Sequence, residues 1–237
     1  MSSVNASLSP VFLRGFQNAA RVQQSLLAGV EKRCLVWLAR RMPAWVTPDH
    51  LTALGLAAMI LGGATYALAR WWPPALLAAN GWLAVNWLGD SLDGTLARER
   101  QCQRPRYGFY VDHIVDSVGA LFLMGGLALS GYMASWVAAG LLLSFYLFSI
   151  NAYLATYTLG TFQLSYAWFS PTEVRLLLAV GNAVAWLRPT VHFFAARPRF
   201  FDVSGTIAMI TMGAVVAVSV AHNVIALYRM EKRECAG

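Results

Sequence analysis

Four aspartates between residues 90 and 116 are the side chains of this chain best suited to chemistry. The stretch reads Asp90-Ser-Leu-Asp93-Gly94-Thr-Leu-Ala97-Arg98 and, after nine residues, Gly108-Phe-Tyr-Val-Asp112-His-Ile-Val-Asp116. The whole chain has only six aspartates, although hydrophobic residues make up 58% of it. Ionised carboxylates beside long apolar runs cost free energy unless they are paired, solvated or bound to a metal. We therefore expect the four to be functional.

The spacing of these residues matches single faces of two helices, because side chains at i, i+3, i+4 and i+7 lie on one side of a helix. The first half of the stretch follows this pattern with Asp90, Asp93, Gly94 and Ala97. The second half places Gly108, Asp112 and Asp116 at i, i+4 and i+8. A short loop joins the two predicted helices, so we expect antiparallel neighbours whose carboxylates converge.

Four converging carboxylates repel one another and attract cations. Carboxylate oxygens are the ligands that Mg²⁺ and Mn²⁺ prefer, so all four aspartates are candidate metal ligands. Two such ions about 3.5–4 Å apart favour displacement at phosphorus, and we expect two. Gly94 and Ala97 leave room for a ligand beside the helix backbone, and Arg98 can bind a phosphate oxygen.

The elements that carry these residues are predicted to be membrane helices. The 237-residue chain has 12% charged residues and a mean hydropathy of +0.52, whereas soluble domains have about 25% charged residues. The apolar residues form several runs long enough to cross a bilayer. The net charge of +7 comes from basic residues beside these runs and not from a basic domain. We therefore do not expect nucleic-acid binding.

We predict an all-α, polytopic membrane protein with six transmembrane helices, at about 50–69, 75–88, 107–129, 136–157, 171–187 and 203–227. Residues 1–46 form an N-terminal amphipathic or juxtamembrane segment, 47–230 the transmembrane catalytic domain and 231–237 a basic tail. Residues 9–44 mix apolar and basic side chains. This pattern predicts an amphipathic helix on the membrane surface or, with equal weight, a helix packed on the transmembrane body.

The distribution of basic residues predicts the orientation. With both termini in the cytoplasm, 14 of the 18 Lys and Arg residues lie on the cytoplasmic side, as the positive-inside rule favours. The four aspartates then lie at the cytoplasmic boundary. The predicted outer loop with Arg188, Arg197 and Arg199 runs against this rule.

The full pattern Asp90-x2-Asp93-Gly94-x2-Ala97-Arg98-x9-Gly108-x3-Asp112-x3-Asp116 resembles the signature of the CDP-alcohol phosphotransferase (CDP-alcohol phosphatidyltransferase) family of integral membrane enzymes that make phospholipids. The resemblance implies a divalent-metal-dependent transferase. In its reaction an acceptor hydroxyl attacks the β-phosphorus of a CDP-linked alcohol, and a phosphodiester and CMP are released.

The resemblance also implies a role for each motif residue. Metal ligands would be Asp90, Asp93, Asp112 and Asp116, and Asp116 would also be the catalytic general base. The residues that contact the nucleotide would be Asp93, Gly94, Ala97, Arg98 and Gly108.

The alcohol that is linked to CDP and the alcohol that accepts the phosphate are harder to infer. The small size and six spans resemble members that use CDP-diacylglycerol and a water-soluble acceptor, which is our first expectation. His113, directly after the third motif aspartate, resembles instead the branch that transfers phosphocholine or phosphoethanolamine to diacylglycerol. His113, Glu173 and Arg175 are candidate acceptor-binding residues, with Arg175 as a ligand for an acceptor phosphate. An ion pair between Glu173 and Arg175 is the alternative.

Two other classes of protein fit the acidic stretch less well. An intramembrane prenyltransferase would carry its two acidic motifs far apart in sequence. A divalent-cation carrier would use the acids for permeation but leaves the glycine, alanine and arginine of the motif without a role. We also expect that Gly125, Gly126 and Gly131 permit a homodimer, with internal helix packing as the alternative.

Overall fold

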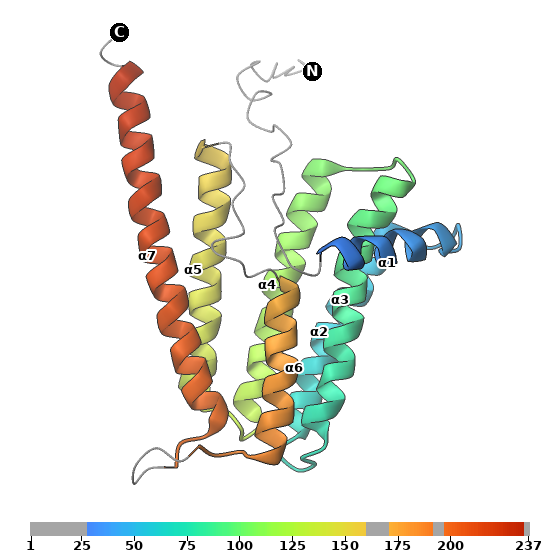
Figure 1. The fold of residues 1–237 in the computed structure, drawn as a ribbon, viewed down its shortest axis with the longest axis vertical. Helices are drawn as coiled ribbons and strands as arrows, with labels where there is room; N and C mark the ends of the chain where they lie inside the picture. The colour runs from blue at the N-terminus through green and yellow to red at the C-terminus, as the bar shows by residue number, and fades with distance from the viewer. Residues whose placement is uncertain (1–27, 160–170, 192–196, 235–237) are drawn as a thin grey trace, which may run out of the picture.

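The computed structural model describes residues 28–159, 171–191 and 197–234, and all regular structure in these ranges apart from one isolated bridge is helical (Figure 1). Seven helices follow one another: α1 (Ala28–Arg41), α2 (Pro48–Leu68), α3 (Ala75–Glu99), α4 (Pro105–Leu129), α5 (Ser135–Leu159), α6 (Pro171–Leu187) and α7 (Phe200–Glu234). The helices α2 to α7 correspond to the six predicted spans. Residues 1–27, part of the predicted amphipathic segment, lie outside the described ranges, as do residues 235–237.

Four of these helices, α2, α4, α5 and α7, are long and apolar enough to cross a membrane. The protein is therefore an integral membrane protein. The other two bundle helices do not meet this criterion in the described ranges: α3 carries charged motif residues in its second half, and α6 has 17 residues with Glu173 and Arg175 in its first turns. Both run alongside the longer helices (Figure 1). Six spans, and the cytoplasmic location of both termini, therefore remain predictions.

The start of α2 is capped by its own side chains. Thr47 caps α2 with Pro48 in its first turn, and the hydroxyl of Thr47 accepts a hydrogen bond from the backbone N–H of His50 at 3.3 Å. The backbone N–H of Thr47 in turn donates to Nδ1 of the His50 ring at 3.2 Å. Two backbone N–H groups that lack a partner within the helix are thus hydrogen-bonded. Proline also begins α4 and α6, where its missing N–H costs no hydrogen bond.

The central helix is α2, which packs against both motif helices, α3 and α4. Close contact at glycines makes this possible. A Cβ atom at Gly89 of α3 would lie 2.7 Å from the backbone oxygen of Leu51, and one at Gly126 of α4 would collide with the backbone of Gly63. Gly126 thus serves internal packing, which was the alternative to a role in a homodimer.

The expected contact between the two motif helices is wrong. Among the described residues α3 and α4 do not pack closely against each other, although they are consecutive and antiparallel. Each packs on α2, and α5 and α6 add to the outer sides of α4 and α3. The shared partner α2, rather than direct contact, therefore sets the positions of α3 and α4.

The short helix α1 lies across the bundle and packs on α3 (Figure 1). Leu35 and Ala39 are buried there, in a cluster with Leu92 and Leu96 of α3. Of the two alternatives for the N-terminal segment, packing on the helical body is what the structure shows for α1. Contact with a membrane surface stays a prediction.

Polar side chains fix α6 in the half of the bundle away from the motif. The Tyr66 hydroxyl of α2 hydrogen-bonds to Asn182 of α6 at 3.0 Å, and Asn182 donates to Asn80 of α3 at 2.6 Å. Tyr66 and Asn182 are fully buried. Because buried polar groups are costly unless paired, this network specifies the position of α6 against α2 and α3.

Candidate active site

Two helices provide the four aspartates, and Asp116 lies within electrostatic range of the other three. Asp90 and Asp93 lie on α3, while Asp112 and Asp116 lie on α4. Asp116 interacts electrostatically with each of the other three, across the space between the two helices. The electrostatic proximity of Asp116 to the other three agrees with the expected convergence, although it does not arise from packing of α3 on α4.

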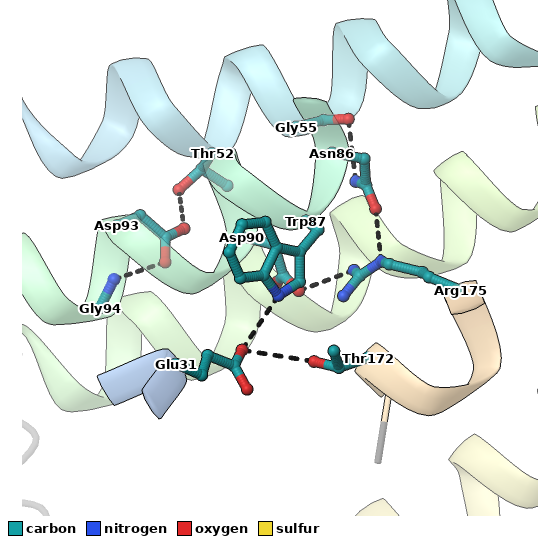
Figure 2. A network of polar contacts seen from close by, with 10 residues as sticks. All are labelled: Glu31, Thr52, Gly55, Asn86, Trp87, Asp90, Asp93, Gly94, Thr172 and Arg175. Atoms are coloured by element: carbon teal, nitrogen blue, oxygen red, sulfur yellow. Dashed lines mark hydrogen bonds and ion pairs between the residues drawn. The ribbon is translucent and has the colours of Figure 1, made fainter. Parts of the chain in front are cut away.

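Asp93 is held by α2 and by its own helix. One carboxylate oxygen accepts a hydrogen bond from the Thr52 hydroxyl at 2.6 Å, and the other accepts from the backbone N–H of Gly94 (Figure 2). Thr52 lies one residue after Leu51, at the crossing where Gly89 permits close approach. The close packing of α2 on α3 therefore also orients Asp93.

Asp90 is held by Arg175 of α6. The Arg175 Nη2 atom lies 2.7 Å from Asp90 Oδ2, and Arg175 Nε donates to Asn86 Oδ1 at 2.8 Å (Figure 2). Asn86 in turn donates to the backbone oxygen of Gly55 on α2 at 3.1 Å. Asn86 is buried, and the side chains of Arg175 and Asp90 are 17% and 26% exposed. One chain of hydrogen bonds thus joins α2, α3 and α6 at Asp90.

Arg175 was expected to bind an acceptor phosphate or to pair with Glu173. The structure shows an ion pair of Arg175 with Asp90, a motif residue 85 positions earlier in the chain, and both expected roles stay predictions. Glu173 lies in the first turn of α6, two residues before Arg175, and is partly buried.

A second set of contacts links α1 and α6 beside this site. Glu31 of α1 accepts a hydrogen bond from the indole N–H of Trp87 at 3.0 Å and one from the Thr172 hydroxyl at 3.4 Å (Figure 2). Trp87 lies on α3 between Asn86 and Asp90 in sequence. These contacts secure the first turn of α6, from which Arg175 reaches Asp90.

The candidate nucleotide-binding residues lie further along α3 and at the start of α4. Arg98 donates to the Thr95 hydroxyl at 2.9 Å, and its guanidinium lies 3.4 Å from where a Cβ at Gly94 would stand. A Cβ at Gly108 would meet nothing within 4 Å. Close packing thus explains why positions 89 and 126 are glycine, but it does not explain the glycine at position 108.

His113, a candidate acceptor-binding residue, lies in an aromatic group with Phe109 and Tyr153. Its ring centroid is 4.1 Å from that of Phe109 and 4.5 Å from that of Tyr153 on α5. Tyr153 also interacts electrostatically with Asp112 and Asp116. The aromatic group therefore borders the α4 side of the site.

Basic residues of the loop between the motif helices fix the polypeptide around the site. Arg100 donates to the backbone oxygens of Met42, Pro43 and Val46, in the segment that joins α1 to α2. Arg104 forms an ion pair with Asp49 at 2.6 Å, and this contact raises the pKa of the Arg104 guanidinium. The positive loop thus holds the start of α2.

No three acidic, histidine or cysteine side chains in the described ranges stand close enough to form a ready metal site. The donor set nevertheless fits a divalent cation by its chemistry, because it consists of four carboxylates, and Asp116 interacts electrostatically with the other three. Two of them are engaged elsewhere, Asp90 with Arg175 and Asp93 with Thr52. Side-chain rotation of these two would be part of metal binding.

Three residues of the site were missed in the sequence. Asn86 stands four residues before Asp90, so its place on the same helical face was available as a signal. Thr52 and Tyr153 lie on other helices, 41 residues from Asp93 and 37 from Asp116 respectively. Nothing in their local sequence indicates contact with the motif.

A sequence profile described as CDP-alcohol phosphatidyltransferase matches residues 45–221 of this chain. Two relatives carry the name cholinephosphotransferase 1. The zebrafish protein is 28% identical over 155 residues, 61% of this chain and 39% of the relative. The human protein is 26% identical over 168 residues, 63% of this chain and 40% of the relative. The matched region thus spans about two fifths of the length of these relatives.

Proposed function

The chain belongs to the CDP-alcohol phosphatidyltransferase family, and we propose that it transfers the substituted phosphate of a CDP-linked alcohol to an acceptor hydroxyl and releases CMP. The observation that carries the proposal is the electrostatic proximity of Asp116 on α4 to Asp112 and to Asp90 and Asp93 on α3. Four carboxylates in one region of the protein are suited to cations and, through them, to a pyrophosphate.

The four aspartates would hold Mg²⁺ or Mn²⁺, most simply two ions. When bound, such ions neutralise the pyrophosphate of the donor and stabilise the leaving CMP. Thr52 orients Asp93 for this role, and Arg175 orients Asp90. Gly94, Ala97, Arg98 and Gly108 would bind the nucleotide, with Arg98 at a phosphate oxygen.

Asp116 would be the general base. It lies on α4, the motif helix next to α5, and its carboxylate interacts with those of Asp90, Asp93 and Asp112. A base must be within hydrogen-bond reach of the hydroxyl that it deprotonates. A carboxylate near the other three can take the proton of an acceptor hydroxyl beside the β-phosphorus, and the hydroxyl oxygen then attacks.

For the substrates, we propose CDP-choline or CDP-ethanolamine as donor and diacylglycerol as acceptor. The names of the two relatives favour this alternative over our first expectation, CDP-diacylglycerol with a water-soluble acceptor. The position of Arg175 supports it too. An arginine that is engaged with Asp90 and Asn86 is not poised for an acceptor phosphate, and diacylglycerol has none.

The test is CMP release by the purified protein in lipid vesicles with Mg²⁺. Parallel reactions contain CDP-choline or CDP-ethanolamine with diacylglycerol, and CDP-diacylglycerol with glycerol 3-phosphate, inositol or serine; Asp116→Asn is the matched control. We expect CMP and phosphatidylcholine or phosphatidylethanolamine in the first set. CMP only from CDP-diacylglycerol would contradict the substrates but not the reaction. Absence of CMP in every reaction, together with Mg²⁺ flux through the vesicles, would favour the cation carrier.

A further inference from the structure

We propose that the outer face of α1 binds the headgroup of an anionic phospholipid from the surrounding bilayer. This site is separate from the four aspartates and does not depend on the transferase reaction. It also goes beyond a general contact of α1 with a membrane, because it requires a preference for negatively charged lipid at named residues.

The helix α1 has two chemically different faces. The inner face carries Glu31, Leu35 and Ala39, which contact α3 and α6. The outer face carries residues at i, i+1, i+4, i+5, i+8 and i+9: Lys32, Arg33, Val36, Trp37, Arg40 and Arg41. Four of the six outer residues are basic. The division is that of an amphipathic helix whose apolar side is already buried against protein.

The outer residues line a groove of about 500 Å³, within the size of small-ligand sites. Val36 and Trp37 provide an apolar wall, and Trp37 is 54% exposed. The Arg41 guanidinium lies 3.8 Å from the centroid of the Trp37 ring, a cation–π contact that holds the charge over the groove. A phosphodiester fits the cations, and the glycerol and first methylenes of a lipid fit the apolar wall.

Within the described ranges, acidic side chains compensate little of the charge of the groove. Glu31, the only acidic residue between residues 28 and 41, is turned to Trp87 and Thr172 on the other side of the helix. Of the four cations, Arg40 pairs with Glu99 at the end of α3, at 2.8 Å. Lys32, Arg33 and Arg41 remain to attract an anion.

The position of α1 favours a bilayer lipid over a soluble anion. The helix lies across a bundle in which α2, α4, α5 and α7 can span a membrane (Figure 1). A helix in this orientation lies along the membrane surface, where exposed tryptophan and basic residues are favoured. Arg40 and Leu35 attach it to α3, the helix of Asp90 and Asp93. A lipid held in the groove would therefore stabilise α1 directly beside the motif.

The experiment uses the full chain in phosphatidylcholine vesicles that contain a trace of photo-crosslinkable lipid, either phosphatidylglycerol or phosphatidylcholine with the same reactive group. Labelled α1 peptide is measured by mass spectrometry. The variant K32Q/R33Q/R41Q keeps Arg40, so that the contact with Glu99 persists. The control R70Q/R188Q/R197Q removes three exposed basic residues at the opposite end of the bundle.

We expect phosphatidylglycerol to label α1 more than phosphatidylcholine does, and labelling to weaken in high salt. Because a basic residue near an anionic surface contributes about fivefold in affinity, the triple variant should lose at least about tenfold of this labelling, while the control variant keeps it. Equal labelling by both lipids, an unchanged triple variant or an equal loss in the control would each overturn the proposal. Displacement by millimolar inorganic phosphate would assign the groove to soluble anions instead and would also overturn it.

Discussion

The contact between Arg175 and Asp90 makes the most discriminating prediction about the active site. Arg175→Ala removes a charged hydrogen bond to Asp90 and a second bond to Asn86. A hydrogen bond to a charged group contributes about 1.5–3 kcal/mol, and both side chains are mostly shielded from water. If about 2 kcal/mol of this orients Asp90 for the reaction, kcat/KM falls about 30-fold.

The assay is CMP release with several acceptors, phosphorylated and unphosphorylated. We expect the same fractional loss with every acceptor that reacts, because Arg175 acts through Asp90. Arg175→Lys keeps the charge but cannot bond Asn86 and Asp90 in one fixed fork, so an intermediate loss of about fivefold is expected. Arg188→Ala, an exposed arginine at the other end of α6, is the matched control.

The combined variant R175A/N86A extends the test. Asn86 holds Arg175 and also the backbone of Gly55, so the two substitutions share partners and their effects should not add. A loss confined to phosphorylated acceptors would refute the reasoning, since it would assign Arg175 to the acceptor phosphate. Full activity of Arg175→Ala would refute both roles.

Four further predictions concern the motif, its packing and its metal ions. Asp116→Asn should lower turnover by about 10²–10⁴-fold, the usual contribution of a general base, while equilibrium binding of the CDP-alcohol survives; near-normal turnover would exclude this base. Gly89→Ala should lower the free energy of unfolding of the protein in detergent by about 1–3 kcal/mol, because the added Cβ would lie 2.7 Å from the backbone oxygen of Leu51. Gly108→Ala, with nothing within 4 Å, should leave stability intact and raise the KM for the CDP-alcohol; a destabilised Gly108→Ala would show that packing explains this glycine. Chelation of divalent ions should abolish CMP release, and Mg²⁺ or Mn²⁺ should restore it; turnover in excess chelator would rule out the metal site.

Much of this protein could be read from local pattern. Apolar runs predicted the six helices α2 to α7, because hydropathy depends on residues adjacent in the chain. The helical period likewise placed Asp90 with Asp93, and Asp112 with Asp116, on shared faces. The family followed from the same spacing, and the match over residues 45–221 confirms it.

Contacts between helices were decided only by the tertiary structure. A short loop between α3 and α4 suggested that they pack together, yet α2 packs on both through Gly89 and Gly126. The interaction of Arg175 with Asp90 joins residues 85 positions apart. A periodic pattern shows which face of a helix is polar, but it contains no information on which helix meets that face. That choice depends on close packing and on pairing of buried charges over the whole bundle.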